Sequence, residues 1–174
     1  MRVYYVRKWG EKLMAENNIM LTSRLLNGRS GHDVGRELLA ELYQKVTGEG
    51  LPPINLSDRG KPYFSDSPWH FSISHTKNHA FCALAKFPVG IDAEEINRVV
   101  HLKLADKVLS NAEKLRFDRC EDKKDAFLRL WVLKEASVKL TGEGLKGYPN
   151  HTDFSQDDPR IQIIDGCYVA VLTE

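Results

Sequence analysis

The sequence predicts an α+β fold made of two similar halves, each with one long helix packed on a small, mostly antiparallel sheet. The pentapeptide TGEGL at Thr47–Leu51 recurs identically at Thr141–Leu145. Each copy follows an apolar helical pattern, and strand patterns lie downstream of each copy. We therefore expect an N-terminal α/β half at residues 1–90 and a C-terminal α/β half at residues 91–174, packed about a pseudo-two-fold axis with a cleft between them.

The first half begins with a segment rich in Val and Tyr, Met1–Lys8, which predicts a strand. A short helix is expected near Ile19–Leu26. Asp33 is the expected N-cap of a longer helix with apolar residues at helical spacing, which Gly48 and Gly50 end. The segment Pro52–Pro68 carries Pro, Asn, Asp and Gly and is expected to be mostly loop.

Three strands are expected in the middle of the chain. The first runs from Trp69 to Ser74, and a turn at Thr76–Asn78 leads to a buried strand at Ala80–Phe87. A short third strand follows at Val89–Glu94.

The second half opens with helical spacing over Val99–Leu109. Ser110 and Glu113 stand three apart, which is the pattern of a capping box at the start of a further helix. Asp122 is expected to begin the longest helix. The chain closes with a predicted β-hairpin at Ile161–Leu172, in which an Asp-Gly pair supplies the turn.

The longest helix, which runs into the second TGEGL copy, has few polar faces and is predicted to be largely buried. Lys134, Glu135 and Lys139 interrupt its apolar surface. A charge on a buried helix is costly unless it meets a partner, a metal or a ligand. Glu135 and Lys139 share one face with Trp131, so they form either a functional pair or an ordinary i,i+4 salt bridge.

Size and charge are those of an ordinary globular protein. The chain has 174 residues, of which 42% are apolar and 28% charged, and its net charge is +1. So small a net charge does not indicate nucleic acid or a membrane as the main partner. Three widely spaced cysteines predict free thiols in a reducing cytoplasm, and neither a signal peptide nor a membrane span is recognisable.

Two acidic residues on the third strand are candidate metal ligands. Asp92 and Glu94 are two apart, so on a strand their side chains point the same way. Adjacent carboxylates repel each other unless a cation or a shared proton lies between them, and Mg²⁺ prefers such oxygens together with phosphate and water. The alternative is a solvated strand end.

Three further residues are candidate ligand contacts. Lys61 stands between Gly60 and Pro62, where its ammonium would act as a point charge on a phosphate. Ser74 and His75 close an apolar strand, where the simpler interpretation is a pair that hydrogen-bonds its own turn.

Four short motifs occur in order: GKP at 60–62, FSISHT at 71–76, GIDAE at 90–94 and WVLKEASVK at 131–139. Together they resemble the signature of the 4′-phosphopantetheinyl transferases, in the single-chain, surfactin-synthetase-activating form. The resemblance implies two similar halves about a pseudo-two-fold axis in a monomeric enzyme. It also implies Mg²⁺-dependent transfer of phosphopantetheine from coenzyme A to a serine hydroxyl of an apo acyl or peptidyl carrier protein, with release of adenosine 3′,5′-bisphosphate.

The resemblance also implies a role for each candidate residue. The residues expected to hold Mg²⁺ on the coenzyme A pyrophosphate are Asp92, Glu94 and Glu135. The residues expected to contact coenzyme A are Lys61 at the 3′-phosphate, Lys139 at the other phosphates, and Ser74 and His75 at the nucleotide end. Glu135 and Lys139 are the expected catalytic pair, with Glu135 or a metal-bound water as the base.

Several alternatives remain open from the residues alone. The basic residues that would assist at the 3′-phosphate are Arg24, Arg29 or Arg36. A basic cluster follows the strand that carries Asp92 and Glu94, and it is either a docking face for acidic carrier proteins or a solvated helix face. Its members are Arg98, His101, Lys103 and Lys107. The competing functions are a catalytically silent module that binds coenzyme A or a carrier protein, and a different Mg²⁺-dependent nucleotide enzyme.

Overall fold

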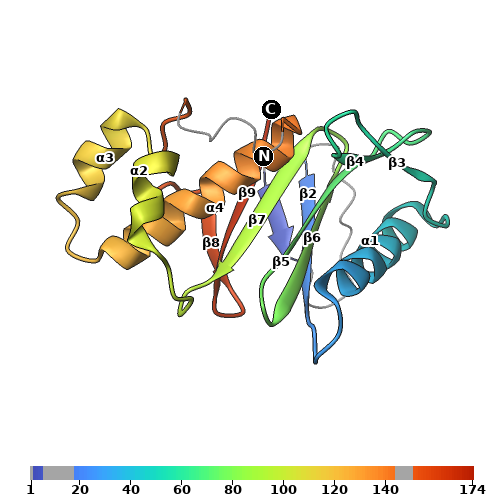
Figure 1. Ribbon diagram of the computed structural model, residues 1–174. Helices are drawn as coiled ribbons and strands as arrows, with labels where there is room; N and C mark the ends of the chain where they lie inside the picture. Colours follow the sequence, from blue (N-terminus) through green and yellow to red (C-terminus); the bar gives the residue numbers. More distant parts are fainter. Residues whose placement is uncertain (1, 6–17, 144–150) are drawn as a thin grey trace.

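The computed structural model describes residues 2–5, 18–143 and 151–174, and it contains two sheets between two long helices (Figure 1). The strands are β1 (Arg2–Tyr5), β2 (Asn18–Leu25), β3 (Ile54–Leu56), β4 (Pro62–Phe64), β5 (His70–His75), β6 (His79–Ala85), β7 (Val89–Glu95), β8 (Ile161–Ile164) and β9 (Cys167–Thr173). The helices are α1 (Gly31–Thr47), the 3₁₀ turn η1 (Leu102–Leu104), α2 (Ala105–Val108), α3 (Asn111–Phe117) and α4 (Lys123–Thr141).

The two sheets pack face to face, with α1 on the outer face of one and α4 on the outer face of the other (Figure 1). Their strand orders are β1-β2-β6-β5 and β7-β9-β8. Alternate residues of β6 point to opposite sides, so Phe81 faces the second sheet and Cys82 faces α1. In β9, Val169 faces the first sheet and Tyr168 faces α4. Each half therefore has its own helix core and shares the core between the sheets.

The same connectivity occurs twice in the chain. In the first half β2, α1, β5 and β6 occur in this order, with the β3–β4 hairpin inserted before β5, and the strands lie in the order β2-β6-β5. In the second half β7, α4, β8 and β9 occur in this order, with η1, α2 and α3 inserted before α4, and the strands lie in the order β7-β9-β8. These pairings are all antiparallel, whereas β1 joins β2 in parallel. The α+β class with small antiparallel sheets is confirmed.

The repeated pentapeptide marks the end of each long helix. Gly48 and Gly142 are the C-caps of α1 and α4, and both adopt left-handed backbone angles, with φ of 77° and 72°. An L side chain is strained there, which accounts for glycine at both positions. The last two residues of the second copy, 144–145, lie outside the described residues.

Two local predictions in the first half are wrong. Ser30, not Asp33, is the N-cap of α1, because the Ser30 hydroxyl accepts the Asp33 backbone N–H at 3.4 Å. The segment expected as a helix at Ile19–Leu26 is mostly β2, because pairing with β6 buries side chains on both of its faces, from Ile19 to Thr22. The segment Pro52–Pro68 is mostly loop as predicted, apart from the short hairpin β3–β4.

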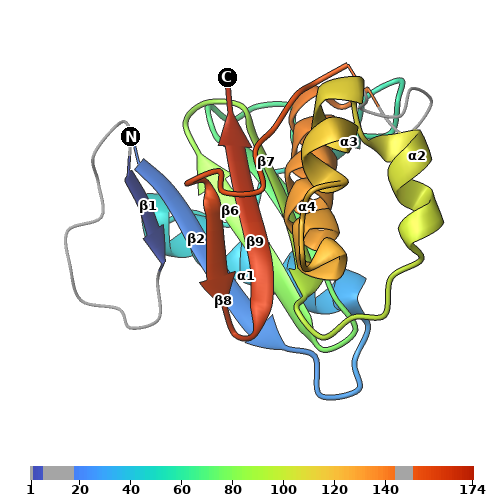
Figure 2. The same ribbon diagram turned by 90° about the vertical axis from the view of Figure 1, so that its left-hand side faces the viewer.

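The burial predicted for α4 is confirmed and has a clear origin. One side of the helix packs on β7 and β9, and α2 and α3 cover the other side (Figure 2). Asp122 is its N-cap, and the capping box of Ser110 and Glu113 opens α3 as predicted. Among the described residues, no helix has the length and apolar character needed to cross a membrane.

The glycine of the GIDAE motif is required by helix packing. A Cβ built on Gly90 would lie 2.1 Å from the Ala136 carbonyl oxygen and 2.5 Å from the Leu140 backbone nitrogen. Gly90→Ala is therefore expected to push α4 away from β7 and to lower the free energy of unfolding by about 3 kcal/mol. Chemical denaturation measures the loss. The control is Gly50→Ala, where a Cβ meets nothing within 4 Å; equal stability of the two variants would contradict the packing explanation.

Candidate active site

The site forms where β5 meets β7, at the junction of the two sheets. The backbone N–H groups of Ile91 and Ala93 on β7 donate to the hydroxyls of Ser72 and Ser74 on β5, at 3.1 and 3.2 Å. These serine hydroxyls thus accept the β7 N–H groups that backbone carbonyls of a neighbouring strand would accept in a continuous sheet. The i,i+2 spacing of the two serines is what directs both hydroxyls at β7.

A buried polar cluster is built on the second of these serines. The Ser74 hydroxyl donates to Asp92 Oδ1 at 2.9 Å, and the Lys139 ammonium donates to the same oxygen at 2.6 Å and to Ser74 Oγ at 3.0 Å. Asp92 is buried, with 6% of its surface exposed. Strands β5 and β7 and helix α4 therefore converge on one carboxylate. The structure thus brings Ser74, Asp92 and Lys139 together.

The face of α4 that carries Trp131, Glu135 and Lys139 lies along β7. Trp131 Nε1 donates to Glu94 Oε1 at 3.1 Å, two turns before Lys139 reaches Asp92. Glu135 lies between these contacts on the same helix face. Lys139 pairs with Asp92, not with Glu135, so the simple i,i+4 salt-bridge interpretation does not describe this face.

Burial and like charge both disfavour ionisation of the glutamates. Burial raises the pKa of Glu135, and the negative charge of Asp92 raises it further. Burial also raises the pKa of Glu94, an effect that its hydrogen bond to Arg98 partly offsets. Carboxylates that repel one another in this way would be stabilised by a shared cation.

The carboxylates are suited to a metal but are not arranged as a complete ligand set. Asp92 Oδ2 is buried and has no hydrogen-bond partner, which is unusual for a carboxylate oxygen and suits a cation. Yet within the described part of the chain, no three acidic, histidine or cysteine side chains are grouped as a metal site. Lys139 holds the other oxygen of Asp92, and the Arg98 guanidinium pairs with Glu94.

A pocket of about 270 Å³ opens beside the cluster. Three cationic side chains line it, from the β3–β4 loop and from α4: Arg59, Lys61 and Lys139. The Lys61 ammonium donates to the carbonyl of Leu140 at the end of α4, and burial lowers the pKa of Lys61. Three positive groups around one pocket are suited to an anionic ligand such as a polyphosphate.

The remaining predicted contacts lie on the other side of β5. His75 points away from Ser74 and lies against the start of α1, where a Cβ on Gly31 would be 2.6 Å from its ring. Arg24 and Arg29 near this helix pair with glutamates of α1, and both contact Glu37. The structure therefore does not place His75 in the pocket that holds Lys61 and Lys139.

The chain is similar to one known family. Residues 88–166, fewer than half of the chain, match the model of the 4′-phosphopantetheinyl transferase superfamily. The matched residues include β7 and α4, which carry the candidate acidic residues and Lys139.

Curated members of the superfamily are similar over part of their length. The 4′-phosphopantetheinyl transferase gsp of Aneurinibacillus migulanus is 32% identical over 65% of this chain and 51% of its own. The transferase Sfp of Bacillus subtilis strain 168 is 37% identical over 53% of this chain and 42% of its own. A putative transferase of Haemophilus influenzae is 28% identical over 84% of this chain and 66% of its own. The chain spans about half the length of the curated superfamily members it matches.

Two features of the site were missed by sequence reasoning. Arg59 lines the pocket and lies 3.8 Å from Glu143 at the end of α4; its position directly before the GKP motif could have identified it. Arg98 was grouped with an exposed basic face, although its i,i+4 spacing from Glu94 pointed to the ion pair that forms.

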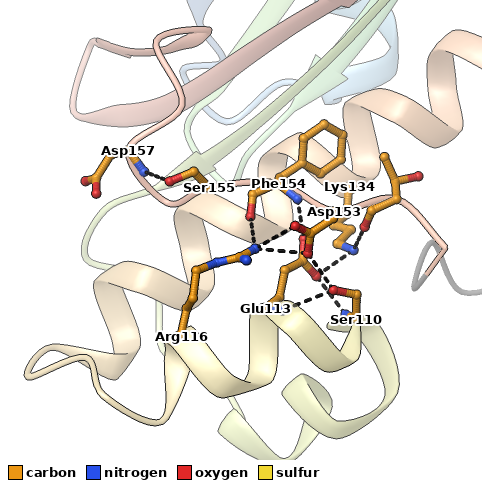
Figure 3. Close-up of polar contacts among 9 residues, drawn as sticks. Ser110, Glu113, Arg116, Lys134, Asp153, Phe154, Ser155 and Asp157 are labelled. Atoms are coloured by element: carbon orange, nitrogen blue, oxygen red, sulfur yellow. Dashed lines mark hydrogen bonds and ion pairs between the residues drawn. The ribbon is translucent and has the colours of Figure 1, made fainter.

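Lys134, next to Glu135 on α4, faces away from the site and forms a buried pair with Glu113 of α3. The two charged groups are 2.7 Å apart, and neither side chain is exposed (Figure 3). Lys134 also donates to the Thr152 carbonyl, and Glu113 accepts the backbone N–H of Phe154 at 2.8 Å. The pair thus ties α3, α4 and the segment before β8 into one unit.

Proposed function

We propose that this chain transfers the 4′-phosphopantetheine group of coenzyme A to a serine hydroxyl of an apo acyl or peptidyl carrier protein. The observation that carries this proposal is the convergence of Asp92, Lys139 and Ser74 beside a pocket with three cationic side chains. This arrangement suits a pyrophosphate, because phosphoryl transfer depends mainly on positioning and on neutralised charge. The curated superfamily members named as such transferases support the same reaction.

The proposal includes Mg²⁺, held by Asp92 together with Glu94 and Glu135. The orphaned Asp92 Oδ2 and the mutual repulsion of the carboxylates favour a cation there. When bound, the ion would neutralise charge on the pyrophosphate oxygens. A cation at Asp92 would compete with the Lys139 ammonium, which would then be free to donate to a phosphate oxygen.

The chain's own groups would position coenzyme A and move one proton. Lys61 and Lys139 hold the phosphates, with Lys61 at the 3′-phosphate, and Ser74 holds the nucleotide end beside them. His75, which faces the start of α1, would contact the nucleotide from outside this pocket. Glu135 accepts the proton of the attacking carrier serine, directly or through a water. The serine oxygen bonds to the phosphorus that bears pantetheine, and the bond to the bridging oxygen of the pyrophosphate breaks. Adenosine 3′,5′-bisphosphate leaves.

We propose further that the halves at residues 1–90 and 91–174 are related by a pseudo-two-fold axis, supported by the repeated connectivity of β2-α1-β5-β6 and β7-α4-β8-β9. The site would lie between them and be complete in a monomer. Free thiols at the three cysteines are consistent with action in the cytoplasm.

The direct test is a mass measurement on carrier proteins. Incubation of the chain with coenzyme A, Mg²⁺ and an apo carrier should add one phosphopantetheine to the carrier and release one equivalent of adenosine 3′,5′-bisphosphate. Failure with every acyl and peptidyl carrier tried would contradict the proposal. If coenzyme A still raised the melting temperature, the catalytically silent binding module would be the correct interpretation. Stabilisation by ATP but not by coenzyme A would indicate a different nucleotide enzyme.

A further inference from the structure

The loop after β7 places the positively charged side chain of Arg98 beside the candidate metal site. The Arg98 backbone N–H donates to the Glu95 carbonyl at 2.9 Å, which closes a tight turn. This turn directs the Arg98 guanidinium back at Glu94, with which it forms an ion pair. The Glu94 side chain is only 16% exposed, so the pair is partly shielded from solvent.

Two of the three acidic residues of β7, Asp92 and Glu94, each have a cationic partner from a different element. Lys139 of α4 holds Asp92, and Arg98 of the loop holds Glu94. Glu94 also accepts the Trp131 indole N–H on the same oxygen, Oε1. Any divalent ion that binds Glu94 must therefore displace the guanidinium or bind beside it. Like charges a few ångströms apart in a partly buried site repel each other, and solvent screening weakens this repulsion.

We propose that Arg98 is a positioning residue that competes with the divalent cation for Glu94 and sets the metal affinity of the site. This inference rests on the metal site of the proposed function. In the metal-free protein, Arg98 neutralises Glu94 and keeps its carboxylate directed at α4. When the cation binds, the guanidinium is released from Glu94, and its partial exposure of 43% gives it room to move toward solvent.

The test measures metal binding rather than turnover. Free Mn²⁺ is titrated by electron paramagnetic resonance in the wild-type chain, in Arg98→Leu and in Arg98→Lys. Arg98→Leu should bind Mn²⁺ about 3- to 10-fold more tightly, because the competing charge is gone. Arg98→Lys should stay within about threefold of wild type, because it retains the charge.

A control variant that loses the same charge separates the direct contact of Arg98 with Glu94 from the long-range effect of removing one positive charge. Lys107 of α2 is exposed, and within the described part of the chain it makes no contact with Glu94, so Lys107→Leu removes the same unit charge away from the site. It should change Mn²⁺ affinity less than about twofold, because exposed charges are screened. The effect of Arg98→Leu should also vanish when Glu94→Gln is already present.

The outcomes distinguish this inference from the proposed function. Equal Mn²⁺ affinity in Arg98→Leu and Lys107→Leu, or no Mn²⁺ binding by any of these proteins, would overturn the role of Arg98. A tighter Arg98→Leu complex in a chain that transfers nothing from coenzyme A would support the role of Arg98 and overturn the function instead.

Discussion

Glu135→Gln is expected to lower kcat for phosphopantetheine transfer by about 10²- to 10⁴-fold, the usual contribution of a general base. Glutamine keeps the size of the side chain but cannot accept the proton of the attacking serine. The fold should survive, because the change removes a partly buried charge whose pKa is already raised by burial and by Asp92. Turnover is measured by mass spectrometry of the carrier, and folding by thermal denaturation.

The control for this variant is Glu121→Gln, an exposed glutamate between α3 and α4, which should retain full activity. Saturating Mg²⁺ should not restore Glu135→Gln, whereas it would compensate for a role confined to metal affinity. More than a tenth of wild-type kcat in Glu135→Gln would contradict the assignment of the base.

The pH dependence provides a second readout for the same residue. The pKa of Glu135 lies above its ordinary value, and only the ionised carboxylate accepts a proton. Mg²⁺ bound at Glu135 would lower this pKa, so the kcat of the wild-type chain should fall as the pH decreases through the pKa of Glu135 in the Mg²⁺ complex. This acid limb should be absent from the residual activity of Glu135→Gln, and its persistence would assign it to another group.

Periodicity and spacing predicted the parts of the site that lie within one element. The i,i+2 rule placed Asp92 and Glu94 on one side of β7, and helical spacing placed Trp131, Glu135 and Lys139 on one face of α4. Both predictions are consistent with the contacts that cross between the two elements. Local geometry alone determines such relations, so a single sequence contains them.

The contacts between different helices and strands were harder to predict from the sequence. Local spacing offered Glu135 as the partner of Lys139, but the packing of β7 against α4 brings Asp92 to it instead. Likewise, Ser74 looked like a residue that bonds its own turn, whereas its hydroxyl bonds β7. The region expected as a helix around Ile19 became β2 because β6 offered a pairing edge and a buried face. Long-range contacts decided each of these cases.

Lys134→Met is expected to lower the free energy of unfolding by about 3–5 kcal/mol, because it leaves the Glu113 carboxylate buried without its cation. Both side chains are fully buried, at 0% exposure. Burial lowers the pKa of the Lys134 ammonium, and the hydrogen bond to Glu113 opposes that change. For a chain of this size the melting temperature should fall by about 2–4 °C per kcal/mol. The exposed Lys124 of the same helix is the control, and Lys124→Met should cost less than about 0.5 kcal/mol.

The double variant Lys134→Met, Glu113→Gln tests whether the unpaired charge is the cause. Glutamine is neutral, and its side-chain oxygen can still accept the Phe154 N–H that Glu113 accepts, so the double variant should be more stable than Lys134→Met alone. If the double variant is instead less stable, the loss comes from packing or from the Thr152 contact, not from the buried carboxylate.

Because Lys134 precedes Glu135 on α4, the same variants show whether the ion pair between α4 and α3 also orients the base. Lys134→Met would then lower kcat at temperatures where it is still fully folded, while Lys124→Met would not.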